Sequence, residues 1–179
     1  MRNFIGIVFL SVAACGTTID LVSSKADETK PRHRIVVEQN NPTIQAIQYV
    51  GYTERSNRQE LRELTGVDPV RTEWCAAFVN AVLEETGIES NKGHAYPLTA
   101  RAFLDWGKQV SKEEIEPGDI VVFPRGNNSW QGHVGFYLKT LKINGLDYYM
   151  ILGGNQNNKV SIVPYRASRA LGIRRNSPI

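Results

Sequence analysis

The chain has 179 residues, of which 41% are hydrophobic and 22% charged, a composition typical of one globular domain. Its net charge of +3 is too small to indicate nucleic-acid binding, and the sequence contains no basic run with interleaved aromatic residues. A small positive charge of this kind would help the protein to adhere to an anionic wall or membrane surface, and it indicates nothing more specific.

The first fourteen residues are typical of an export signal. Arg2 supplies the positive charge, and the apolar run at 4–14 is too short to cross a bilayer as a helix. The segment Val12-Ala13-Ala14-Cys15 resembles a bacterial lipobox, in which the cysteine is lipidated and becomes the first mature residue. Ordinary secretory cleavage after Ala14 is the alternative. We expect an exported protein anchored by lipid on Cys15, in the outer membrane facing the periplasm if the source is Gram-negative, because Gly16 and not aspartate follows.

Residues 15–41 form the lipidated cysteine and a polar tether, and 42–179 form the predicted domain. The hydrophobic spacing and the cap signals predict helices first and strands afterwards. Asn144-Gly145 between two apolar runs is a strong hairpin signal. This order indicates an α+β layout in which N-terminal helices pack on an antiparallel sheet. The predicted helices are 43–50, 57–65 (ended by Gly66), one from a Thr72 cap to Gly87, and 99–107; the predicted strands are 120–123, 133–143, 146–152, 160–163 and 171–174.

Cys75 is the one cysteine left if Cys15 carries lipid. A Thr72 cap would place Cys75 in the first turn of a helix, where free backbone N–H groups and the helix dipole favour a thiolate. The same N–H groups could bind an oxyanion. The alternative is an inert, buried cysteine on an apolar helix face.

His133 lies on a predicted strand between Gly132 and Gly135, which leave space around its ring. It is a candidate base, and the alternative is a histidine satisfied in the core. If Ile143 pairs with Leu146 across the turn, the residue numbers of every opposed pair add up to 289. In this register His133 lies opposite Gln156. A one-residue bulge, plausible at Gly153-Gly154, would bring Asn155 to the histidine instead.

Together these motifs resemble the cysteine, histidine-dependent amidohydrolase/peptidase (CHAP) family and its NlpC-type relatives. The resemblance covers about residues 43–175. It implies a papain-like α+β fold, hydrolysis of peptidoglycan amide bonds, Cys75 as nucleophile, His133 as base and Asn155 as the orienting residue. The motifs that carry it are Trp74-Cys75-Ala76-Ala77-Phe78-Val79, Pro117-Gly118-Asp119-Ile120-Val121-Val122-Phe123, Gly132-His133-Val134-Gly135-Phe136-Tyr137 and Leu152-Gly153-Gly154-Asn155-Gln156.

Two tryptophans are candidates for substrate contact. Trp130 lies in a polar loop before the histidine strand, where it could stack on sugar or peptide. Trp74 could also contact substrate, although a tryptophan on an apolar helix face is more often core. Asp119 is expected to stabilise a turn rather than act as an acid. A metal site from Cys75, His94, Asp119 and His133 is not expected, because no paired ligand spacing supports it.

The expected function is an exported cysteine peptidase or amidase that acts on peptidoglycan peptides through a thioester. No cofactor is expected, and the partners are the wall peptide and, through lipid, a membrane; the chain is expected to be a monomer. One alternative is a wall-binding lipoprotein without turnover. Another is a thiol acyltransferase on the same fold.

Overall fold

The computed structural model describes residues 41–177. The predicted export signal and almost all of the predicted tether, including Cys15, lie outside this range. Within it, no helix is both long enough and apolar enough to cross a membrane. The elements are α1 (Pro42–Ile47), α2 (Arg58–Thr65), α3 (Cys75–Glu85), η1 (Asn91–Gly93), η2 (Ala100–Asp105), β1 (Lys108–Gln109), β2 (Ile120–Pro124), β3 (Gly132–Ile143), β4 (Leu146–Gly153), β5 (Ser161–Arg166), η3 (Ala167–Arg169) and β6 (Gly172–Arg175).

The first two helices begin and end at residues that satisfy their free backbone groups. The Asn41 side chain accepts a hydrogen bond from the Thr43 N–H, and Pro42 occupies the first turn, where its missing N–H costs nothing. Helix α2 ends at Gly66, which adopts the left-handed conformation with φ 73°. The predicted end of this helix is therefore confirmed. Helix α1 is shorter than predicted, and its apolar residues Ile44 and Ile47 are exposed.

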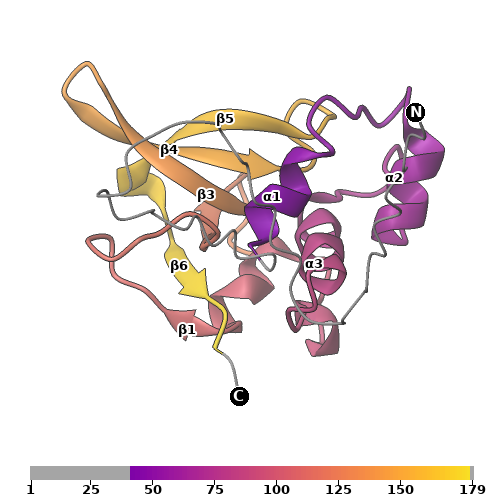
Figure 1. Ribbon diagram of the computed structural model, residues 1–179, viewed down its shortest axis with the longest axis horizontal. Coiled ribbons are helices and arrows are strands. Elements are labelled where there is room, and N and C mark those ends of the chain that lie inside the picture. Colours follow the sequence, from indigo (N-terminus) through magenta and orange to yellow (C-terminus); the bar gives the residue numbers. More distant parts are fainter. Residues whose placement is uncertain (1–40, 178–179) are drawn as a thin grey trace, which may run out of the picture. The chain divides into compact units, whose positions relative to one another are not determined.

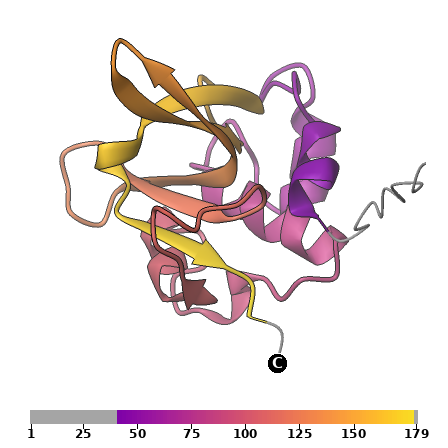
Figure 2. The same ribbon diagram turned by 60° about the vertical axis from the view of Figure 1, so that its left-hand side comes forward.

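Helix α3 is buried on every side rather than along one stripe. Its first nine residues, Cys75–Leu83, all have buried side chains. Helix α3 packs against strand β3 and against both other helices, and α1 also contacts the sheet (Figures 1 and 2). A helix in that position is held mainly by apolar burial, and its first residue, Cys75, is placed as firmly as the core itself.

The segment predicted as a fourth helix, 99–107, is instead the shorter 3₁₀ helix η2. Its Phe103 and Trp106 side chains are buried as the spacing indicated. The helix ends at Trp106 with an extended conformation. The apolar spacing marked the buried face correctly but did not distinguish between the two helix types.

Six strands form one sheet in the order β1-β6-β2-β3-β4-β5, and every pair is antiparallel. Asn144 and Gly145 have φ 50° and 77°, as the predicted two-residue hairpin turn requires. Ile143 pairs with Leu146, and this register continues to Lys139 and Met150. The register then shifts by one residue between Tyr137 and Lys139. A bulge is therefore present, but it lies in β3 and not at Gly153-Gly154.

The strands bury side chains on both faces of the sheet, because residues alternate between the faces. In β2, Ile120 and Val122 join the core beneath α3, while Val121 and Phe123 join a second cluster with Tyr149. The predicted α+β class, with N-terminal helices on an antiparallel sheet, is confirmed.

Gly154 is the point where the end of the β3–β4 hairpin meets α3. A Cβ atom on Gly154 would lie 2.5 Å from Trp74 Cζ3 and 2.7 Å from Phe78 Cβ. Neither neighbour is the end of a flexible chain, because Trp74 and Phe78 are fully buried and pack edge to face. Only glycine fits this contact without displacing the helix.

Gly154→Ala should therefore destabilise the protein by about 1–3 kcal/mol, because one methyl group overpacks the junction. Gly93→Ala is the matched control, since a Cβ at Gly93 meets nothing within 4 Å. Urea unfolding of both variants measures the difference. Equal stability of the two variants would contradict the tight helix–sheet contact.

Candidate active site

Cys75 is the first residue of α3, so the predicted first-turn position is confirmed. The predicted cap is wrong: Trp74 and not Thr72 is the N-cap, and its side chain makes no cap hydrogen bond. Thr72 instead ends a turn in which its N–H bonds the Asp68 carbonyl. The start of α3 thus has no side-chain cap within residues 41–177, so its first-turn N–H groups face no capping oxygen.

The thiol is almost fully enclosed, with 4% of the residue exposed. Burial raises the pKa of the Cys75 thiol, against a lowering by the Arg125 charge and by hydrogen bonds from the Val134 and Ala76 N–H groups. The lowered pKa expected from the helix start is therefore outweighed by desolvation in the free protein. Val134 directly follows His133, so its contact with sulfur brings the thiol to the start of the histidine strand.

His133 is the second residue of β3 and is 1% exposed. Its ring stacks on Tyr165 with centroids 5.2 Å apart and planes 15° from parallel, and Tyr165 in turn stacks on Phe123. Burial, with a contribution from the Arg125 charge, lowers the pKa of His133 to about 3. The imidazole is consequently neutral at neutral pH.

Gln156 determines which ring nitrogen carries the proton. Its Oε1 lies 3.2 Å from His133 Nε2, while its Nε2 donates to the carbonyls of Ile151 and Gly153 at 3.3 and 3.2 Å and to that of Ser161. Because the amide nitrogen is occupied by carbonyls, the atom facing the ring is an acceptor, so His133 Nε2 must donate. Nδ1 is then unprotonated, and it has no hydrogen-bond partner within residues 41–177. It is the nitrogen available to accept a proton.

The expected contact between Asn155 and His133 is wrong. The bulge in β3 would put Asn155 opposite His133 if the ladder continued, but β4 ends at Gly153. Asn155 then has φ 55°, which turns its side chain away to donate to Glu73 Oε2 at 2.6 Å. The turn brings Gln156 to the ring instead, as the unbulged register had indicated for a different reason.

A polar cluster of Glu73, Arg125 and Asn155 joins the loop before α3 to the two segments around the histidine. Arg125 donates to the Asn155 carbonyl at 2.8 Å and lies 3.5 Å from Glu73 Oε2. Sequence analysis missed both Arg125 and Glu73. The only available signal was their position: Glu73 lies two residues before the thiol, and Arg125 directly follows a buried strand.

The two tryptophans have different environments. Trp74 is fully buried against Phe78 and Gly154, so its predicted direct contact with substrate is contradicted. Trp74 is buried because it directly precedes α3, a helix whose first nine residues are all buried. Trp130 is 64% exposed and lines a surface hollow with His94 and Tyr96.

Asp119 has the turn role expected of it and a second one that the sequence did not indicate. Its Oδ2 accepts from the Glu116 N–H at 2.8 Å, and its carboxylate binds Arg175 through Nε at 2.7 Å and Nη2 at 2.9 Å. Within residues 41–177, the Asp119 carboxylate makes no hydrogen bond or ion pair with Cys75 or His133. In the part of the chain described, no three His, Cys, Asp or Glu side chains are grouped so as to hold a metal ion.

Comparison with known proteins decides the family of this site. Residues 67–155 match the family model of the CHAP domain. The chain carries a CHAP domain. The match includes Cys75 and His133 and ends at Asn155, one residue before Gln156. CHAP domains are typically cysteine hydrolases that act on peptidoglycan.

Two solved structures are similar to this CHAP-domain chain. An NlpC/P60 family protein from Bacillus cereus is 16% identical, with a TM-score of 0.48, and the match covers 78% of this chain and 40% of that one. A protein from Staphylococcus aureus described as similar to lipoprotein, NLP/P60 family, is 18% identical, with a TM-score of 0.52, covering 79% and 42%. The chain thus spans less than half the length of either protein, and the likeness concerns the fold. A search of the curated proteins finds no match.

The depressed pKa of His133 makes folding depend on pH. The unfolded histidine binds a proton below its ordinary pKa near 6.5, whereas the folded one does so only near 3. Stability is therefore full above pH 6.5 and falls by about 1.4 kcal/mol per pH unit as the pH drops below it. Between pH 6.5 and 4.5, before the paired carboxylate of Asp68 protonates, urea unfolding should show this slope.

His133→Gln should remove the slope, and His94→Gln, at a surface histidine, should keep it. A wild-type stability that stays constant from pH 6.5 to 4.5 would contradict the buried, neutral imidazole.

Proposed function

We propose that this protein is an exported cysteine hydrolase that cleaves amide bonds in peptidoglycan peptides through a thioester on Cys75. The observation that supports it most is the orientation of His133. Gln156 holds the proton on Nε2 and leaves Nδ1 without a partner, and the Val134 N–H beside it contacts the sulfur of Cys75. A fixed base beside a thiol at a helix start is the arrangement that nucleophilic catalysis needs.

The pKa shifts suggest how the reaction begins. Since burial raises the pKa of the Cys75 thiol and lowers that of His133, the resting pair is neutral, and proton transfer accompanies attack. The sulfur attacks the amide carbonyl as its proton moves to Nδ1, and the oxyanion is bound by first-turn N–H groups of α3. His133 then protonates the leaving amine as the C–N bond breaks, which leaves a thioester. A water molecule, deprotonated by His133, hydrolyses the thioester and regenerates the thiol.

Cys75→Ala should abolish hydrolysis and change the free energy of unfolding by no more than about 1 kcal/mol, because alanine suits a helix start and loses only one buried atom. Digestion of purified peptidoglycan, with mass spectrometry of the fragments, measures activity and identifies the bond. Retained turnover in this variant would defeat the cysteine mechanism. Products with the acyl group on an added amine, in place of free carboxylate, would indicate the acyltransferase alternative.

Gln156 is proposed as the residue that orients His133, in place of the expected Asn155. Gln156→Met, which keeps the volume but not the hydrogen bonds, should lower kcat by about a hundredfold or more, because the tautomer is no longer fixed. Asn155→Ala should lower it less than about tenfold, since Asn155 acts on Glu73. Iodoacetamide labelling of Cys75 and near-ultraviolet circular dichroism check that both variants stay folded. The reverse order of activities would assign the orienting role to Asn155.

Lipid anchoring through Cys15 is also proposed, supported by the lipobox-like segment and the short apolar run before it. Intact mass spectrometry of the mature protein should show lipid on Cys15, and Cys15→Ser should release the protein or block its processing. A mature chain with an unmodified Cys15 thiol would mean ordinary secretion.

A further inference from the structure

The polar cluster of Glu73, Arg125 and Asn155 takes no part in the proposed acylation steps, yet it joins the segments that carry them. Arg125 Nη2 donates to the Asn155 carbonyl at 2.8 Å, and Asn155 Nδ2 donates to Glu73 Oε2 at 2.6 Å. Arg125 Nη1 lies 3.5 Å from the same Glu73 oxygen. These segments adjoin the site, because Cys75 begins α3, β2 pairs with the histidine strand and Gln156 follows the turn after β4.

The guanidinium of Arg125 is fixed on one side and unsatisfied on the other. Its Nη2 is engaged by the Asn155 carbonyl, whereas Nη1 is buried and makes no hydrogen bond within residues 41–177. A buried N–H group of this kind is costly, because it has lost water and gained no acceptor. Attraction to a nearby anion is the compensation that remains, and the Glu73 carboxylate supplies it in the free protein.

Water screens the two charges of this ion pair unequally. The Glu73 side chain is 81% exposed and the Arg125 side chain 38%. A well-solvated carboxylate neutralises a neighbouring cation only in part, so Arg125 keeps a positive field toward the enclosed thiol. The directions agree with this geometry. Burial raises the pKa of Cys75, the Arg125 charge lowers it, and the Glu73 charge raises it with a smaller effect than that of Arg125.

Two further titratable groups belong to this part of the site. His133 lies on β3 and Tyr165 on β5, where the tyrosine stacks on the imidazole. Both are neutral at neutral pH, because burial lowers the pKa of His133 to about 3 and raises that of Tyr165. Within residues 41–177, the charged side chains that act on the Cys75 sulfur are therefore Arg125 and Glu73.

We propose that Arg125 is a positioning residue for the nucleophile: its guanidinium, held by Asn155, stabilises the negative charge that develops on the Cys75 sulfur, and Glu73 limits this effect as its counter-ion. This role rests on the proposed function, in which the thiol proton moves to His133 as the sulfur attacks. Asn155 then acts on the nucleophile through Arg125 and Glu73, and not on the base.

The test is the rate at which iodoacetamide alkylates Cys75 as a function of pH, followed by intact mass spectrometry. The reagent is uncharged, so Arg125 does not attract it, and the thiolate is the form that reacts. Arg125→Gln should slow alkylation at a fixed pH about tenfold, the low end of the effect of a neighbouring opposite charge, because Arg125 is partly exposed. Glu73→Gln, whose amide oxygen can still accept from Asn155, should accelerate it about two- to threefold.

The opposite signs separate a charge effect from a structural one. Both substitutions remove the ion pair between Arg125 and Glu73, so a cluster that only ties segments together would respond to both in the same direction. Arg125→Lys keeps the charge and should alkylate within about threefold of the wild-type rate. Slower alkylation in both neutral variants, or a lysine variant as slow as Arg125→Gln, would overturn the proposal. If Arg125→Gln does not fold, as near-ultraviolet circular dichroism would show, the acceleration in Glu73→Gln decides.

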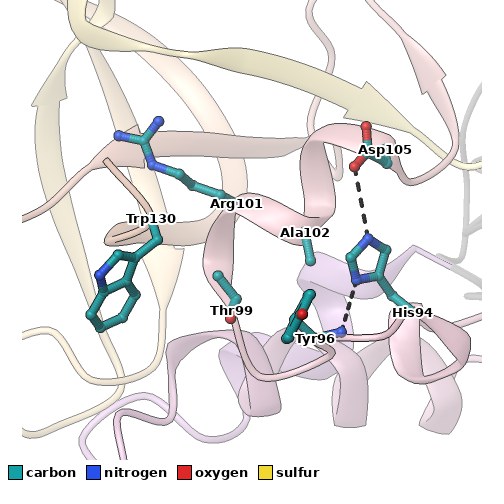
Figure 3. A pocket seen from close by; sticks show the side chains of 7 residues that line it. All are labelled: His94, Tyr96, Thr99, Arg101, Ala102, Asp105 and Trp130. Carbon is teal, nitrogen blue, oxygen red and sulfur yellow. Dashed lines mark hydrogen bonds and ion pairs between the residues drawn. The ribbon is translucent and has the colours of Figure 1, made fainter. Parts of the chain in front are cut away.

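Arg101 and Asp105 provide the matched controls. Figure 3 shows both in a surface hollow, pointing away from each other. Arg101 also adjoins the histidine strand, where its Nε donates to the Gln131 carbonyl at 2.7 Å, but within residues 41–177 neither charge contributes to the pKa of Cys75. Arg101→Gln and Asp105→Asn change the net charge by the same amounts and should leave the alkylation rate unchanged. A control that shifts the rate as much as its counterpart would reveal a general effect of net charge and overturn the proposal.

Turnover separates this role from the proposed function. If the wild-type chain hydrolyses no peptidoglycan, the proposed function fails, and the alkylation rates still judge Arg125. If it hydrolyses peptidoglycan, Arg125→Gln should lower kcat about tenfold and change KM by less than about twofold, because Arg125 acts on charge that develops during attack. A raised KM with unchanged kcat would place Arg125 in substrate binding and overturn the proposal.

Discussion

The close contact of Gly154 with Trp74 and Phe78 is the constraint on which the geometry of the site depends. It joins the first turn of α3 to the turn after β4, so the residue before Cys75 touches the segment that carries Gln156. Because protein interiors are close-packed and transmit small displacements, the thiol and the base are positioned by one shared contact. The glycine is needed here for space and not for a special backbone conformation.

The Gln156 amide and the Arg125 charge together set the protonation of the site. The Gln156 amide donates to backbone carbonyls on one side and accepts from His133 on the other. A carboxylate at the same position would favour a charged imidazole, whereas a neutral amide leaves it neutral. The Arg125 charge acts in the same direction on both groups, because it lowers the pKa of Cys75 and that of His133. That field favours thiolate and disfavours imidazolium, so the site stores no preformed ion pair.

The sequence predicted those features that depend on local chemistry. Gly66 and Asn144-Gly145 were assigned correctly because glycine and asparagine favour positive φ angles at helix ends and in two-residue turns. The residues alone left open whether Gln156 or Asn155 contacts His133, because the answer depends on where β4 ends and on a bulge in β3 that the strand's sequence does not indicate. The predicted cap of α3 was wrong for a related reason. The start of α3 is decided by packing against a distant segment, and the local pattern carries no information about that segment.

A second set of contacts fixes the strand that carries the base. Asp119 and Arg175 form a two-contact ion pair that ties the turn before β2 to the end of β6, and β2 pairs directly with β3 at Phe123 and His133. Phe123 also stacks on Tyr165, which stacks on the imidazole. His133 is therefore held by its hydrogen bond with Gln156 and by the Tyr165 ring, on a strand next to one that the Asp119 pair anchors. The base is thus fixed by contacts of the folded chain itself, whereas Tyr96 and Trp130 lie in loops and are largely exposed.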